Sequence, residues 1–363
     1  MTFSLNSVIK LPILDSRVIR RSGFALLSGV ALVATGCAAD GLGDGFDRDP
    51  HNGGEIADPN SDSPPPPIII DPDDAQGADP VPAVFAAKQA NPSNLIVTDE
   101  SLYWVQFANN EVTLNWMHVD GGDPVTVGTL DSLPFSSVAD DAGIYFAASS
   151  EQNIVFAPHL GLEARPLHAS TTDPLAVQVT DDFAYWTAAD GCVFRGAIEG
   201  GDAQELACGL GAPVSLSLVD GSAYWTTTDG ALYRTSLEPS GAVDKLLSDE
   251  DFSAGIVADE SGVYWADAQR REVLSFSFDT GAYEVLASSQ YEPAGVTQDR
   301  FYLYFTTQGD GGIKRVLKSG NGEMDIMAKG QAEPGQVVAT EDWLYWINEG
   351  DGSVMRLLKN YNY

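Results

Sequence analysis

A pair of adjacent aromatic residues returns about every 40 residues through most of this chain, and no other feature restricts the fold as strongly. Successive pairs are 42, 40, 39, 40, 40 and 41 residues apart, with no helical pattern between them. Such a period without helices is typical of β-propeller blades, each of which is a small antiparallel sheet. The seven pairs are Tyr103-Trp104, Tyr145-Phe146, Tyr185-Trp186, Tyr224-Trp225, Tyr264-Trp265, Tyr304-Phe305 and Tyr345-Trp346.

Each repeat contains signals for four short strands. In six copies a proline stands twelve residues before the second aromatic residue, and an apolar strand follows it. An acidic turn leads into the second strand, which carries the aromatic pair. A turn such as Asp190-Gly191 then predicts a hairpin into a third strand, and a glycine-containing turn follows before the fourth. Adjacent strand residues point to opposite faces, so each aromatic pair makes both faces apolar, as stacked blades require. The turn aspartates are Asp99, Asp140, Asp181, Asp220, Asp259, Asp299 and Asp342.

The two ends of the repeat region complement each other. The last copy has three strand signals and no fourth, whereas an additional strand at 84–87 precedes the first copy. Residues 84–104 align without gaps on residues 326–346, so the N-terminal strand is predicted to supply the outer strand of the last blade and to remove its free edge. The sequence therefore predicts an all-β, seven-bladed β-propeller over residues 84–363, closed by a 1+3 clasp.

The first 37 residues are typical of a bacterial export signal. Four basic residues precede an apolar run at 24–33, which is too short to span a bilayer as a mature helix. The run ends in Ala34-Thr35-Gly36-Cys37, which resembles a lipobox. We predict a signal peptide at 1–36 and lipid attachment at Cys37; the alternative is an ordinary cleavage site followed by an unrelated cysteine. Ala38, the residue after the predicted lipidation site, is not an evident signal for retention at the inner membrane. We therefore expect a lipid-anchored protein of the cell envelope, at the outer membrane or cell surface.

Residues 37–83 are predicted to form a disordered tether. The segment is rich in Asp and Pro, so it buries too little apolar surface to fold, and its like charges extend it. Asp40, Asp44, Asp47 and Asp49 raise the alternative of a calcium loop, although they lack the regular spacing and final glutamate of an EF-hand. The whole chain has 52 acidic and 19 basic residues and a net charge of −33, which disfavours nucleic acid as a partner.

The aromatic motif resembles that of the YWTD-repeat propellers of low-density lipoprotein receptors. Threonine follows the pair at Thr187, Thr226 and Thr306, and aspartate takes the fourth position at Asp267 alone. The resemblance runs from Pro92 to the C-terminus, at about one aromatic pair per blade. That family has six blades and an endocytic role, so this chain is more similar to the secreted YW-repeat propellers of bacteria. The resemblance implies the fold and no particular function.

Cys192 and Cys208 are predicted to form a disulfide. Cys192 begins the third strand of the third repeat and Cys208 ends the fourth, with a turn near Gly200-Gly201 between them. Such a turn places the two cysteines almost opposite each other, within bridging reach. An exported protein also meets oxidising conditions. The alternative is a pair of buried free thiols.

No motif for catalysis or cofactor binding stands out. The chain has four histidines without metal-ligand spacing, and it lacks HExxH, GxSxG and P-loop motifs. Our leading hypothesis is a monomeric, non-catalytic binding or interaction scaffold for an unknown protein, peptide or glycan, without a cofactor. The alternatives are a calcium-dependent hydrolase or lactonase, whose ligands would come one per blade, and a purely structural envelope protein. We expect binding at the face of the fourth-to-first and second-to-third strand loops, where the polar stretches are 89–91, 171–173, 249–251, 290–292 and 331–333.

Overall fold

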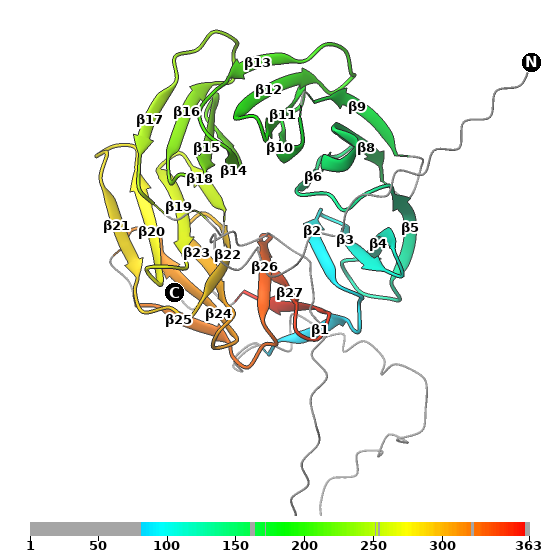
Figure 1. Cartoon of the computed structure of the whole chain (residues 1–363). Coiled ribbons are helices and arrows are strands. Elements are labelled where there is room, and N and C mark those ends of the chain that lie inside the picture. Colours follow the sequence, from blue (N-terminus) through cyan, green and yellow to red (C-terminus); the bar gives the residue numbers. More distant parts are fainter. Residues whose placement is uncertain are drawn as a thin grey trace, which may run out of the picture.

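Seven four-stranded sheets stand in a ring around a common axis (Figure 1). The computed structural model describes residues 81–159, 164–170, 172–250, 252, 255–320 and 323–359, so the predicted signal peptide, Cys37 and the tether up to residue 80 lie outside the described residues. Within them are 28 strands and a 3-10 helix, η3 (Ser149–Glu151). The predicted all-β, seven-bladed propeller is confirmed. A helix long and apolar enough to cross a bilayer is not found in this part of the chain.

We number the blades in chain order and their strands from the axis outward. Blades 1 to 4 are β2 (Pro92–Val97), β3 (Ser101–Ala108), β4 (Glu111–His118), β5 (Val125–Leu130); β6 (Ser137–Ala139), β7 (Gly143–Ala148), β8 (Asn153–Pro158), β9 (Arg165–Ala169); β10 (Pro174–Val179), β11 (Phe183–Ala188), β12 (Cys192–Ala197), β13 (Gln204–Ala207); and β14 (Pro213–Val219), β15 (Ser222–Thr227), β16 (Leu232–Ser236), β17 (Asp244–Leu247). Blades 5 to 7 are β18 (Ile256–Asp259), β19 (Gly262–Asp267), β20 (Glu272–Ser277), β21 (Tyr283–Ala287); β22 (Pro293–Gln298), β23 (Tyr302–Thr307), β24 (Gly312–Leu317), β25 (Asp325–Ala328); and β26 (Pro334–Ala339), β27 (Trp343–Asn348), β28 (Ser353–Leu358), β1 (Ala83–Ala86).

The innermost strands contact one another around the whole ring, and β26 of blade 7 contacts β2 of blade 1. Blade 7 takes its outer strand from the start of the described chain. β1 pairs antiparallel with β28, with Ala83 opposite Arg356 and Val84 opposite Met355. The same blade therefore contains both the first and the last strand of the described residues.

The core lies between blades and follows one rule. The tyrosine of each aromatic pair packs toward the next blade, and the second aromatic residue packs toward the preceding blade. Tyr103 thus belongs to one core cluster with Phe146, and at the closing interface Tyr345 belongs to one cluster with Trp104. The other clusters combine Tyr145 with Trp186, Tyr185 with Trp225, Tyr224 with Trp265, Tyr264 with Phe305, and Tyr304 with Trp346. All fourteen side chains are buried, as the sequence pattern predicts.

The turn before each aromatic strand uses two kinds of residue. Asp140 accepts hydrogen bonds from the backbone N–H groups of Ala142 and Gly143 and, at 2.9 Å, from the hydroxyl of Tyr145. Asp259 and Asp299 do the same in blades 5 and 6. Thr98, Thr180 and Thr340 occupy this position in blades 1, 3 and 7. The seven turn aspartates therefore do not share one position, because Asp99, Asp181, Asp220 and Asp342 stand one or two residues later.

A residue just after the third strand covers the tyrosine of the preceding blade, on the same face of the ring as the turn before the aromatic strand. His159 of blade 2 stacks on Tyr103, and its Nδ1 lies 3.1 Å from the tyrosine hydroxyl. Phe278 stacks on Tyr224 with ring centroids 4.7 Å apart. Lys318 lies over the ring of Tyr264 and pairs with Asp259, and Lys359 lies over the ring of Tyr304 and pairs with Asp299. Neighbouring blades are thereby joined by specific contacts.

The threonine that follows three of the aromatic pairs holds the innermost strand. Most of these strands are bulged near their first residues, which frees a backbone N–H from the ladder. The N–H of Ala176 donates to Thr187 Oγ1 at 3.1 Å, and that of Gly295 donates to Thr306 Oγ1 at 2.8 Å. The threonine of the motif is thus explained by hydrogen bonding within the blade.

Candidate functional site

A cavity of about 480 Å³ lies between blades 1 and 2. Its volume falls in the range of small-molecule sites, roughly 300–1,000 Å³. One wall comes from β4 and β5 and the other from β7, β8 and β9. The described residues that line it are Leu114, Val127, Gly128, Thr129, Leu130, Asp131, Ser132, Pro134, Phe146, Ala148, Glu151, Val155, Ala157, Pro158, Ala164 and Pro166.

Small side chains account for the space. The second aromatic residue of blade 2 is Phe146, whereas five of the seven blades have tryptophan at this position. Ala148 and Ala157 continue the same wall, and Gly128 faces them from β5. Gly128 pairs with Leu114, whose side chain packs toward blade 2, so a side chain at 128 would point the same way. A Cβ atom built on Gly128 meets no atom within 4 Å, so the wall there is open.

Two carboxyl groups are the only charged groups among the described lining residues. Asp131 belongs to the loop from β5 to β6, and Glu151 ends η3 between β7 and β8. Burial raises the pKa of the Glu151 carboxyl, Asp131 raises it further, and a 3.5 Å hydrogen bond from Ser132 opposes the shift. Arg165 lies next to the lining residues Ala164 and Pro166, but its guanidinium stacks 5.2 Å from the ring of Phe156. The cavity is therefore lined by both polar and apolar surface, and its two described charged groups are both acidic.

Several polar loop residues that the sequence offers as ligand contacts hold the fold instead. Gln89 and Gln331 each accept a hydrogen bond from a motif tryptophan, Trp104 and Trp346, with N–O distances of 3.2 Å. Gln290 is buried and accepts a hydrogen bond from Lys314 at 3.0 Å. The stretches at 171–173 and 249–251 are described only in part. The two acids of the cavity lie in loops of the same two kinds, but outside the polar stretches that the sequence offers.

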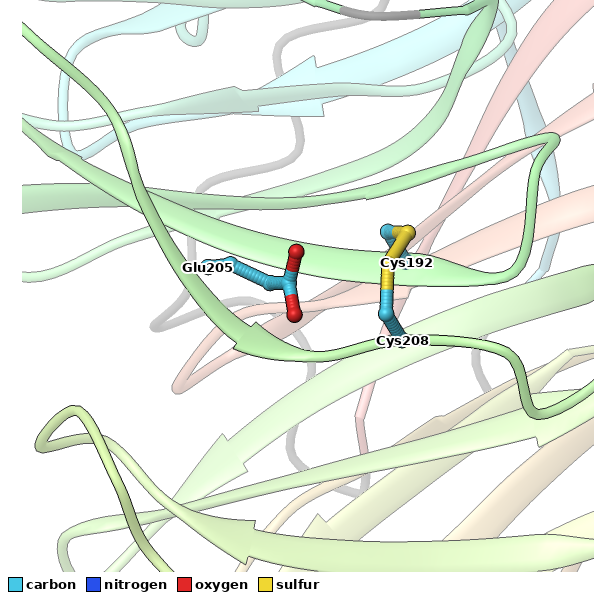
Figure 2. A group of neighbouring side chains, drawn as sticks. All are labelled: Cys192, Glu205 and Cys208. Carbon is cyan, nitrogen blue, oxygen red and sulfur yellow. A yellow bond between two sulfur atoms is a disulfide. The ribbon is translucent and has the colours of Figure 1, made fainter.

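Cys192 and Cys208 are joined by a disulfide between the start of β12 and the residue after β13. Figure 2 shows the carboxylate of Glu205 beside them. Among the described residues this is the one group of three or more His, Cys, Asp or Glu side chains whose ligand atoms lie within 4.8 Å of one another. A thiolate is the form of cysteine that binds metals, and the disulfide leaves none at either sulfur.

The three described histidines have structural partners. His159 Nε2 lies 2.7 Å from the carbonyl oxygen of Asp140. His168 is buried against Trp186 and lies between the carbonyl oxygens of Ala197 and Gly201. His118 forms an ion pair with Asp120 over 3.3 Å when it is protonated. His159 and His168 therefore join different elements of the ring, whereas His118 pairs within the turn that follows its own strand.

No protein-family model and no curated protein matches the chain. Among solved structures, a streptogramin B lyase matches with a TM-score of 0.64 and 14% identity, over 78% of this chain and 98% of the lyase. Virginiamycin B lyase from Staphylococcus aureus matches with a TM-score of 0.62 and 15% identity, over 77% and 99%. The computationally designed Ika8 protein matches with 0.51 and 15%, over 76% and 96%. At these identities the likeness shows the β-propeller fold alone.

Proposed function

We propose that the protein is a non-catalytic binding module that takes a small apolar ligand, or an apolar side chain of a peptide or protein, into the cavity between blades 1 and 2. The observation that carries this proposal is the cavity of about 480 Å³ itself, whose wall is open beside Gly128. Empty apolar space in a protein lowers its stability, so such a space at one interface of a repeated fold favours a binding role.

The N-terminal sequence supports a location for this activity. Lipid attachment at Cys37 would anchor the chain in the bacterial cell envelope, and the acidic tether would hold the propeller away from the bilayer. In this arrangement the protein acts as a monomeric scaffold that presents its cavity at the outer membrane or cell surface. Labelling with radioactive palmitate in the wild type and in Cys37→Ser tests the anchor directly.

Filling the cavity tests the binding role. We expect the purified chain to bind the neutral dye Nile red saturably, with a rise in fluorescence. Gly128→Val should weaken this binding by about tenfold or more, because the added side chain occupies the apolar space and removes contact area. Valine favours strands and meets open space here, so the variant should fold with an unchanged thermal transition.

The matched control is Val125→Leu, on the same strand but outside the cavity, at a residue that is 48% exposed. It should leave dye binding unchanged. Saturable binding that Gly128→Val leaves intact would locate the dye elsewhere on the molecule and would overturn the proposal.

A further inference from the structure

Within the described residues, the outer strand of each blade has one edge without a partner strand. Proteins commonly protect such edges with charged residues, with proline or by keeping the strand short. β9 contains Arg165 and Pro166, and β13, β17, β21 and β25 each contain an acidic residue. β1 carries no charge, but it has only four residues. The edges of blades 2 to 7 are therefore poor templates for a further strand.

β5 of blade 1 has none of these protections. It has six residues, more than any other outer strand of the ring, and it contains neither a charged residue nor proline. Val125, Thr126 and Thr129 are exposed, and most residues of the strand are β-branched, which favours an extended chain. Among the described residues, no backbone hydrogen bond outside the sheet of blade 1 involves β5. Its edge is therefore open to an additional strand.

The strand register identifies a backbone N–H that faces this edge. Thr126 of β5 lies opposite Asn115, the residue that pairs with the second aromatic residue of blade 1. Pro166 of β9 lies opposite Val155, which has the same partner in blade 2, so Thr126 and Pro166 occupy equivalent positions. Proline has no N–H, yet β9 pairs with β8 there, so the ladder does not use an N–H at this position. The N–H of Thr126 therefore points away from β4, toward the free edge.

Charge indicates what the additional strand can be. β5 lies between Asp123 and Asp131, both exposed, and residues 119–132 include no basic residue. A second copy of the chain is a poor occupant, because antiparallel pairing of two β5 strands would bring Asp123 of each copy toward Asp131 of the other. Each copy would also bring a net charge of −33. A strand with basic residues has the complementary charge.

We infer that β5 is a docking edge for an extended segment of a partner protein, which adds a fifth strand to blade 1 and carries basic residues beside uncharged strand residues. In this mode of recognition, backbone hydrogen bonds supply the affinity and alternate side chains supply the specificity. The inference goes beyond the proposed function, because the edge is a different surface from the cavity. Thr126, whose N–H faces the edge, is not among the described residues that line the cavity.

Selection from a phage-displayed library of random dodecamer peptides, on the immobilised purified chain at physiological salt, provides the probe. We expect enrichment of peptides in which Lys or Arg flanks a run rich in Val, Ile and Thr. A synthetic, fluorescein-labelled copy of the most enriched peptide then gives affinities by fluorescence anisotropy. Thr126→Pro should weaken its binding by about tenfold or more, because the edge loses an N–H donor and gains the proline ring.

Two variants are matched controls for this proline. Thr126→Val removes the same hydroxyl but keeps the N–H, and Val285→Pro places a proline at the equivalent position of β21 in blade 5. Both should leave binding unchanged. The fold accepts either residue at this position, since blade 2 has Pro166 there and blade 5 has Val285.

A pair of N-methylated peptides tests strand pairing without any change to the protein. Along an extended strand, alternate residues direct their N–H groups to opposite edges. Methyl groups on one set of alternate backbone nitrogens should therefore abolish binding, and methyl groups on the other set should leave it nearly unchanged. Equal effects of the two sets would rule out strand addition.

The remaining outcomes separate this inference from the proposed function. The docking edge is wrong if no peptide is enriched, if acidic peptides are enriched, or if Thr126→Pro leaves binding intact. Nile red binding that Gly128→Val weakens would then still support the cavity. Conversely, dye binding that is insensitive to Gly128→Val would overturn the proposed function and leave the docking edge in place.

Discussion

Asp299 joins two blades through a single carboxyl group. It accepts hydrogen bonds from the backbone N–H groups of Phe301 and Tyr302, from the hydroxyl of Tyr304 at 2.7 Å and from Lys359 of blade 7 at 3.0 Å. Burial alone would raise its pKa, but these donors outweigh burial and hold the pKa of Asp299 well below the ordinary value of 3.8. The carboxylate form is therefore the one that stabilises the fold.

We expect Asp299→Asn to lower the free energy of unfolding by about 2 kcal/mol at pH 7, since an amide loses the charged bonds to Lys359 and the tyrosine. A depressed pKa contributes stability that is fully present above the unfolded value of 3.8 and is lost as pH falls toward the folded value. The difference between wild type and variant in urea unfolding should therefore shrink below pH 4. Asp279→Asn, at an exposed position, should show no such difference; equal curves for both variants would contradict this role.

At the scale of single elements, the third and fourth strands of blade 3 are joined at one end. The disulfide between Cys192 and Cys208 closes a loop with a sequence separation of 16. Because β13 is a short outer strand whose start is exposed, the cross-link keeps an element with little burial of its own on the sheet.

Cys192→Ala/Cys208→Ala should lower the free energy of unfolding by about 3 kcal/mol, the value of the loop-entropy model for a loop of this size. Urea unfolding with and without dithiothreitol measures the effect. Reductant should destabilise the wild type by a similar amount and leave the variant unchanged. A wild type that is indifferent to reductant under unfolding conditions would contradict the stabilising role of this bond.

The strands could be predicted from sequence more completely than the cavity. Blade number follows from the aromatic pairs, because a strand with bulky apolar residues on both faces must be covered on both sides. The cavity depends on several small residues from two blades, such as Gly128 and Ala164, that no local pattern connects. Phe146 in place of tryptophan was the one visible signal. Asp131 and Glu151 could not be predicted as cavity residues, because their positions depend on how two loops from different blades meet.

At the scale of the whole molecule, the pairing of β1 with β28 links the two ends of the described chain. Phe85 on β1 is 9% exposed and packs edge-on against Tyr345, with centroids 5.8 Å apart. Arg356 of β28 lies between Phe85 and Trp343. The first strand therefore contributes packing to the last blade as well as backbone hydrogen bonds.

Phe85→Ala should lower the free energy of unfolding by about 3 kcal/mol, as truncation of a buried phenylalanine predicts. Its neighbour Val84 points outward and is 59% exposed, so Val84→Ala should cost well under 1 kcal/mol, about the range of surface substitutions. Tryptophan fluorescence during urea unfolding compares the two. Equal effects would mean that β1 adds little to the stability of the ring.

The contacts after each third strand restrict the order in which the repeats can follow one another. Lys318 forms an ion pair with Asp259 of the preceding blade, and Lys359 forms one with Asp299 of its own preceding blade. Placed after blade 1, either lysine would meet Thr98, which carries no charge, at the position of the aspartate. His159 in turn forms a hydrogen bond with the hydroxyl of Tyr103 in the blade before it. The seven repeats share one strand arrangement but are not interchangeable. Shuffling or deleting a copy would bring together blades whose contact residues do not pair, at the interfaces on both sides of it.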